Sequence, residues 1–162
     1  SLENVLVSRQ IFPFGLRVLI KTRRPFAYGE KLLNGKKIYG FIDKNGFFIN
    51  KKYAEKTVLD ESALQVFGWQ ENSRKTLSKI LTSQKNGEFE LVKISFSQNG
   101  FLTLEEKDLQ TVFLGFNQNL IEAQLQIIGN LKNQLNKNNF TGKIDNVDLT
   151  DPNYPKIKVF KP

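Results

Sequence analysis

The chain has 162 residues, with 24 basic and 16 acidic side chains, a net charge of +8, and no His, Cys or Met. Without His and Cys it cannot build a Ser-His-Asp triad, a cysteine nucleophile, or a zinc site with imidazole or thiolate ligands. Its length suits one domain of ordinary size, or one domain and part of a second.

The positive charge is concentrated in the first half of the chain. Residues 1–81 carry 15 basic and 7 acidic side chains, a net of +8, whereas residues 82–162 carry 9 of each. An excess of basic residues in one half indicates an anionic binding partner, such as nucleic acid, a membrane surface or an acidic protein. The alternative is a lysine-rich surface that only faces solvent. No apolar run approaches the roughly 20 residues that span a bilayer. Because the chain starts with Ser rather than Met, we expect a fragment that has lost its N-terminal part.

The first predicted element is a β-hairpin. Residues 2–10 and 16–22 are rich in apolar and β-branched side chains, and the segment between them contains Pro13 and Gly15. A two-stranded hairpin is marginally stable in water, so it needs a cover from elsewhere. Pro25 then interrupts the strand pattern, and the basic segment 31–37 is predicted to be a loop.

Two Asn-Gly pairs predict further hairpins. Asn45-Gly46 lies between the apolar runs 38–42 and 47–49, and Asn99-Gly100 joins 89–97 to 101–105. Because both residues tolerate positive φ, these pairs predict type I′ turns. Together with a strand at 109–114, the second pair predicts an antiparallel meander.

Two helices and a final hairpin complete the prediction. Apolar residues recur at helical spacing over 73–84 and over 117–136, and the stripe of the second helix includes Ala123 and Gln124. The tail predicts strands at 143–149 and 156–160 around a turn at 151–155, with Ile157 and Val159 facing inward. The fold class is therefore α+β, an antiparallel sheet with two helices packed on it.

Nothing in the chain indicates catalysis. There is no Gly-rich phosphate loop, and Asp145 and Asp148, three apart in a predicted strand, are a poor metal pair. We expect no enzyme activity, no cofactor and no metal site. Basic residues interleave with aromatic ones at 23–28 and 36–41, a pattern that suits nucleic acid but is also ordinary in sheet cores.

The last predicted strand is a candidate partner-binding site. A terminal strand is often at a sheet edge, where free N–H and C=O groups can accept another strand. Lysine on such an edge is also a device against unwanted pairing, so the alternative is a protected edge with no partner.

Four patches follow one another along the chain: Arg9–Val18 running into Thr22–Ala27, Gly40–Gly46, Leu114-Gly115 with the following helix, and Val147–Leu149. In this order they resemble the FtsQ/DivIB family of bitopic bacterial cell-division proteins. Within them the family motif falls on Arg23, Pro25, Ala27, Asp43, Gly46, Gly115, Asp148 and Leu149.

The resemblance implies both architecture and role. Residues 1–24 would be the C-terminal hairpin of a truncated POTRA domain, and 25–162 an FtsQ-type β domain. The protein would be a non-catalytic divisome scaffold at the septum, anchored in the inner membrane by one span, with this part on the periplasmic side. It would recruit partners of the FtsB/FtsL type through its C-terminal sheet edge, at Tyr154, Lys156, Ile157, Lys158, Val159 and Phe160.

Three alternatives stay open. A basic nucleic-acid-binding module, a POTRA-type translocation or interaction module, and attraction of the basic half to an anionic membrane surface are each compatible with the composition.

Overall fold

The computed structural model describes residues 2–11, 14–54, 58–86, 89–138 and 140–160. The strands are β1 (Leu2–Gln10), β2 (Gly15–Thr22), β3 (Pro25–Leu33), β4 (Lys36–Asp43), β5 (Phe48–Asn50), β6 (Gln65–Trp69), β7 (Leu91–Phe96), β8 (Leu102–Glu106), β9 (Gln110–Gly115), β10 (Ile144–Asp148) and β11 (Lys156–Val159). The helices are α1 (Arg74–Lys85) and α2 (Ile121–Lys137), with short 3₁₀ turns η1 (Lys51–Tyr53), η2 (Glu71–Ser73) and η3 (Gln118–Leu120).

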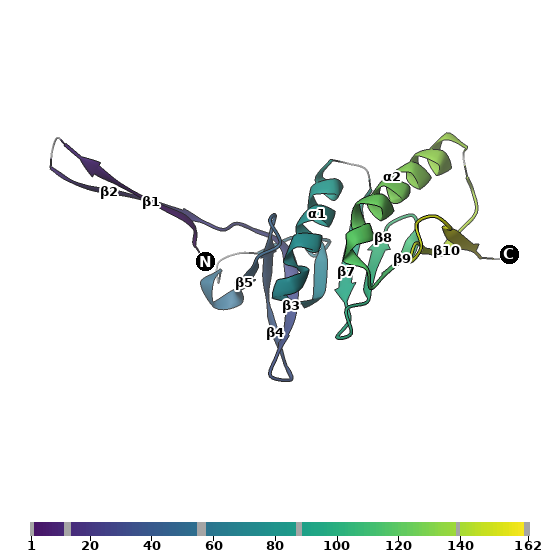
Figure 1. The fold of residues 1–162 in the computed structure, drawn as a ribbon, viewed down its shortest axis with the longest axis horizontal. Helices are drawn as coiled ribbons and strands as arrows, with labels where there is room; N and C mark the ends of the chain where they lie inside the picture. Colours follow the sequence, from purple (N-terminus) through teal and green to yellow (C-terminus); the bar gives the residue numbers. More distant parts are fainter. Residues whose placement is uncertain (1, 12–13, 55–57, 87–88, 139, 161–162) are drawn as a thin grey trace.

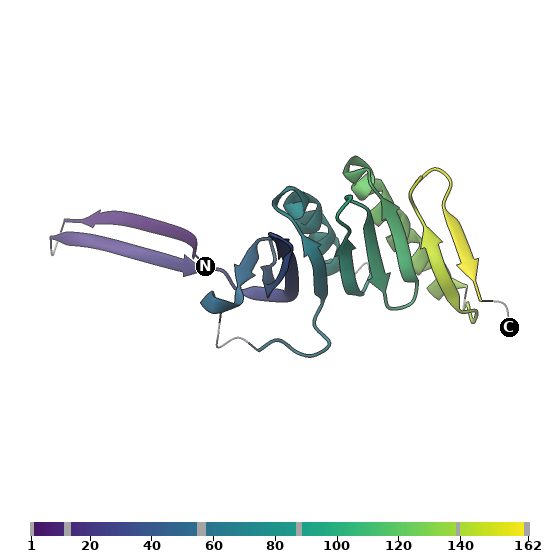
Figure 2. The same ribbon diagram turned by 90° about the horizontal axis from the view of Figure 1, so that it is seen from below.

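Nine strands form one mixed sheet. Their order is β11-β10-β9-β8-β7-β6-β3-β4-β5, and only the β3/β6, β6/β7 and β9/β10 pairs are parallel. Both helices lie on the same face of this sheet (Figures 1 and 2). The predicted α+β class, a largely antiparallel sheet with two helices packed on it, is confirmed.

The β1–β2 hairpin is a separate two-stranded sheet that projects from one end of the molecule (Figure 1). Its register places Val5 and Val7 opposite Ile20 and Val18, so these four side chains share one face. All four are exposed. The predicted strands are confirmed, and the hairpin has an apolar face with nothing packed on it among the described residues. Phe12 and Pro13 of the predicted turn lie outside those residues.

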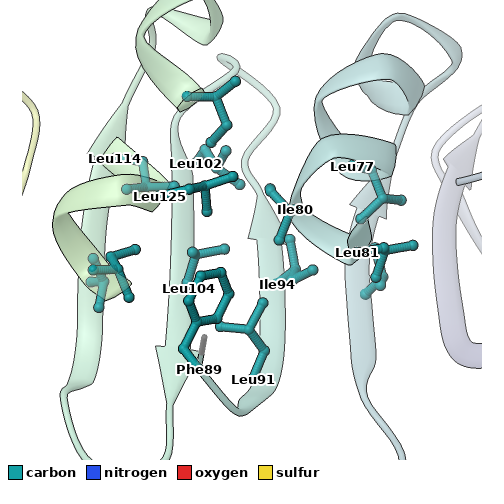
Figure 3. Close-up of a cluster of buried hydrophobic side chains, with 14 of the residues drawn as sticks. Leu77, Ile80, Leu81, Phe89, Leu91, Ile94, Leu102, Leu104, Leu114 and Leu125 are labelled. Atoms are coloured by element: carbon teal, nitrogen blue, oxygen red, sulfur yellow. The ribbon is translucent and has the colours of Figure 1, made fainter. Parts of the chain in front are cut away.

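The core lies between the helices and the middle of the sheet (Figure 3). The apolar stripe of α1, formed by Leu77, Ile80 and Leu81, is buried, as are Ile94 of β7 and Leu125 of α2. Both predicted helices are confirmed, although Ala123, which the pattern placed on the apolar stripe of α2, is exposed.

The turn chemistry differs from the prediction. At both predicted type I′ sites only the glycine has positive φ, +78° at Gly46 and +88° at Gly100. Their amides donate to the carbonyls of Asp43 and Ser97, which is the pattern of a type I turn followed by a left-handed glycine. The hairpins are right, but their turn type is wrong.

The segment 31–37 is not a loop. It contains the ends of β3 and β4, joined by Asn34-Gly35 with φ of 51° and 74°, the pair of positive values that a type I′ turn requires. Pro25 begins β3 rather than interrupting a strand, because the first residue of a strand tolerates a missing N–H.

Candidate partner-binding edge

β11 forms one end of the nine-stranded sheet (Figure 2). It pairs with β10, and no strand in the described part of the chain lies against its other side. The predicted partner-binding residues Lys156 to Phe160 therefore follow an open edge.

The backbone of β11 divides its hydrogen-bonding groups between two sides. The N–H of Phe160 donates to the carbonyl of Lys143, which precedes β10, at 2.9 Å. Because backbone groups alternate in direction along a strand, Lys158 also faces β10, while the N–H and C=O of Ile157 and Val159 point outward. These outward groups are the ones that an added strand would use.

The side chains of the edge alternate between the two faces of the sheet. Ile157 pairs with buried Val147 and Val159 with buried Ile144, so both lie on the face that carries the helices. Each is nevertheless 47% exposed. The predicted inward direction is right, but neither side chain is buried.

The lysines of the edge lie on the opposite face. Lys158 forms an ion pair with Asp145 of β10, with 3.0 Å between Nζ and the carboxylate, and Lys156 is the cross-strand partner of Asp148. Positive charge on this face is thus partly balanced by acidic residues of the neighbouring strand.

The turn into β11 is well defined. Asp151 accepts hydrogen bonds from the N–H of Asn153, through its side chain, and from the N–H of Tyr154, through its carbonyl. The Tyr154 side chain is exposed beside the start of the strand. At the other end of β11, Phe160 contributes to a hollow of about 470 Å³ that Phe140 also lines.

Three residues that the sequence resemblance singles out lie at the ends of β9 and β10 and support this edge. Gly115 ends β9 with a φ of +83°, and a side chain there would press against Thr150. The N–H of Leu149 donates to the carbonyl of Phe113 at 2.8 Å. Asp148 accepts from both the hydroxyl and the N–H of Thr150.

These hydrogen bonds also act on the charge of Asp148. The Thr150 hydroxyl, then its N–H, and to a smaller degree Lys156 stabilise the carboxylate and hold the pKa of Asp148 below its ordinary value. The ionised side chain therefore fixes the bend that leads from β10 into the turn.

Gln124 of α2 binds to the ends of both β9 and β10. Its side chain is 1% exposed, and its Nε2 donates to the carbonyls of Leu114 and Leu149, at 2.7 Å each. It thereby joins the helix to the ends of β9 and β10. Helical spacing placed Gln124 on the buried stripe, but nothing in the sequence showed which carbonyls it would meet.

The remaining motif residues form a second cluster at the other end of the sheet. Arg23, just after β2, donates to Asp43 at 2.8 Å, and the two side chains are only 14% and 4% exposed. The other Asp43 oxygen accepts from the N–H groups of Asn45 and Phe47. Pro25 and buried Ala27 lie on the adjoining strand β3.

Aromatic contacts complete the second cluster. The Arg23 guanidinium lies 3.6 Å from the Phe47 ring centroid, and that of Arg74 lies 4.2 Å from it. Trp69 donates from Nε1 to the carbonyl of Gly46 at 2.8 Å. This cluster connects the projecting hairpin to the sheet and does not touch the β11 edge.

The acidic group near residue 106 has a structural role. Buried Glu106 accepts from the N–H groups of Asp108 and Leu109 in the β8–β9 turn, and from Lys132 of α2. Burial lowers the pKa of Lys132, but its hydrogen bonds to Asp108 and Glu106 outweigh this effect and raise it. Glu106 therefore holds the β8–β9 turn and links it to α2.

Comparisons with known proteins do not identify a family. No protein-family model matches the chain, and a search of curated proteins finds no match. Within the described residues, no helix has the length and apolar character needed to span a bilayer.

Proposed function

We propose that this chain is the extracytoplasmic part of a non-catalytic divisome scaffold of the FtsQ/DivIB type. In this proposal the full protein is a single-pass inner-membrane protein at the division septum. It recruits a small membrane protein of the FtsB/FtsL type, which adds a strand to the outer edge of β11.

The observation that carries the proposal is the unfilled edge of β11. Ile157 and Val159 offer outward backbone groups and half-exposed apolar side chains in the same short segment. An added strand would satisfy those backbone groups and cover both side chains at once. The ordered resemblance of the four sequence patches supplies the identity of the class.

The two clusters of motif residues support the same assignment. One holds the bend before β11 through Gly115, Asp148 and Leu149, and the other fixes the hairpin junction through Arg23 and Asp43. A motif distributed in this way is suited to positioning surfaces, since its members are buried or internally bonded.

Val159→Pro tests the edge directly. Proline removes the outward N–H of Val159 and leaves the inward bond of Phe160 to Lys143 in place. We expect binding of the purified FtsB/FtsL-type protein from the same bacterium to fall at least about tenfold, because both a donor and the fit of the incoming strand are lost. Val159→Ala keeps the N–H and is expected to bind more tightly than the proline variant.

The controls separate folding from binding. Thermal unfolding of both variants should give midpoints close to that of the parent, because β11 is exposed along its whole length. Undiminished binding by a folded Val159→Pro variant would contradict strand addition. Absence of a tagged full-length chain from the septum would contradict the divisome assignment, and affinity for nucleic acid that falls steeply with salt would favour the basic-module alternative.

A further inference from the structure

The distal part of the β3–β4 hairpin stands free of the sheet. β3 pairs with β6 only as far as Lys31, and β4 pairs with β5 only from Gly40 onward. Residues 32–39, which we term the β3–β4 arm, therefore pair only with each other and project beyond the neighbouring strands (Figure 1).

The arm combines apolar and basic side chains at its tip. Leu32 and Leu33 are 46% and 52% exposed, and Lys36 and Lys37 are exposed opposite them. The register pairs Leu32 with Lys37 on one face and Leu33 with Lys36 on the other. Each face of the tip thus carries one leucine and one lysine, with exposed Tyr39 further from the turn.

The charge of the arm is not neutralised by its surroundings. No acidic residue occurs between positions 31 and 42. Glu30 forms an ion pair with Lys37 at 3.2 Å, but the Lys37 side chain stays 60% exposed. Residues 30–39 hold three lysines against this one glutamate, 3 − 1 = +2, and Lys31 lies near the Phe48 ring, which leaves Lys36 and Lys37 as the exposed lysines of the tip. A tip with two exposed leucines and surplus lysine is complementary to an apolar layer beneath an anionic one.

A second exposed apolar group lies at the same ends of the strands as the arm. Because β6 and β7 run parallel to β3, the β7–β8 turn emerges on the side to which the arm points (Figure 1). Exposed Phe116, at the end of β9 on that side, packs edge-on against Phe101 with centroids 4.9 Å apart. The arm and Phe116 are therefore exposed apolar groups at the same ends of the strands, and the arm projects further than the β7–β8 turn (Figure 1).

We propose that the β3–β4 arm docks on an anionic lipid bilayer. Leu32 and Leu33 enter the interfacial layer, Lys36 and Lys37 meet lipid phosphates, and Tyr39 lies at headgroup depth, where its ring and hydroxyl suit the mixed environment. The arm is near the end of the sheet opposite to β11, so this contact does not depend on strand addition.

Vesicle partitioning tests the electrostatic part. The complete chain is titrated with vesicles of phosphatidylcholine alone and of phosphatidylcholine with phosphatidylglycerol. Lys36→Gln/Lys37→Gln should weaken partitioning into the anionic vesicles by about fivefold per lysine. Lys51→Gln/Lys52→Gln makes the same change in net charge at another exposed pair and should have an effect of less than about twofold.

Fluorescence quenching tests insertion and its location. The chain has one tryptophan, buried Trp69, so Leu33→Trp adds a reporter at the tip that brominated lipid should quench. Leu19→Trp is the matched control, because Leu19 in the β1–β2 hairpin is also 52% exposed. Quenching of Leu19→Trp instead of Leu33→Trp would place the membrane contact on the hairpin and overturn the proposal.

Two other outcomes would overturn it. If the Lys51/Lys52 variant weakened vesicle partitioning as much as the Lys36/Lys37 variant, the attraction would come from the overall charge of the chain. If the parent chain did not bind anionic vesicles, the arm would have no lipid contact. Val159→Pro should leave vesicle partitioning unchanged, so failure of the arm and failure of the β11 edge can be told apart.

Discussion

Replacing Gln124 by leucine should weaken the link between α2 and the candidate partner-binding edge. Leucine has a similar size and suits a buried helix position, so the packing is largely kept. What is lost is the Nε2 group that donates to the carbonyls of Leu114 and Leu149 at 2.7 Å each.

The expected loss follows from the two carbonyls. A buried acceptor deprived of its partner costs about 1–3 kcal/mol, so the pair costs about 2–6 kcal/mol. Burying the added apolar atoms of leucine returns about 1–2 kcal/mol. Taking the middle of each range, about 4 kcal/mol lost and about 1.5 kcal/mol regained, we expect the free energy of unfolding to fall by about 2–3 kcal/mol. For a domain of this length the thermal midpoint should then fall by roughly 4–12 °C.

Urea unfolding with a matched variant measures this effect. Gln126 is exposed on the same helix, so Gln126→Leu should change stability by less than about 0.5 kcal/mol. Hydrogen exchange should also accelerate at the amide of Leu149, which bonds to Phe113 beside the lost contact. Equal stability of the Gln124 and Gln126 variants would refute the assignment of Gln124 as the clamp on β10.

Two further predictions concern the bend after β10 and the glycines of the sheet. Asp148→Asn should be less stable than the parent at neutral pH. Because folding lowers the pKa of Asp148, its contribution is present above the ordinary value of 3.8 and is lost as the pH falls through the folded value. Thermal midpoints of parent and variant should therefore converge in acid, and a difference that persists there would contradict the role of the carboxylate. Gly68→Ala should cost more than about 3 kcal/mol or prevent folding, because φ is +67° and the new Cβ would collide with the carbonyl of Phe96. Gly35 has a similar φ of +74° but no atoms near its Cβ position, so Gly35→Ala should lower the free energy of unfolding by only about 1 kcal/mol in a urea titration. Equal losses of stability in the two variants would show that φ, and not the collision with Phe96, determines the cost.

The turns show how far local sequence determines the fold. Three of the four Asn-Gly pairs, at 34–35, 45–46 and 99–100, form hairpin turns, and the side chain two positions before each of these three pairs decides the turn type. Asp43 accepts from the amides of Asn45 and Phe47, and Ser97 Oγ accepts from the amide of Phe101, which favours the longer loop. Leucine precedes Asn34-Gly35 and offers no acceptor, so the two-residue turn forms. The sequence analysis predicted a loop at this pair because the surrounding lysines are also typical of loops.

The candidate site was predictable in position but not in environment. A terminal strand of alternating lysine and apolar residues indicated an edge, and the chain order places it there. The exposure of Ile157 and Val159, and the clamp made by Gln124, depend on which strands lie beneath α2. The packing of α2 on these strands brings together residues that are far apart in the sequence, so no local sequence pattern predicts it.

The openness of the β11 edge follows from the connections between the strands. Each helix links two strands on the same face of the sheet, α1 between β6 and β7 and α2 between β9 and β10, as parallel connections require. β11 is added by a turn instead, so no helix is brought over it, and Ile157 and Val159 stay half exposed (Figure 2). Pro155 immediately before β11 has no N–H to offer, which keeps the accessible edge short. Because β11 offers few outward backbone groups, long strand pairing between two copies of the chain is disfavoured. A short partner strand fits this edge better, with the residues next to that strand covering Ile157 and Val159.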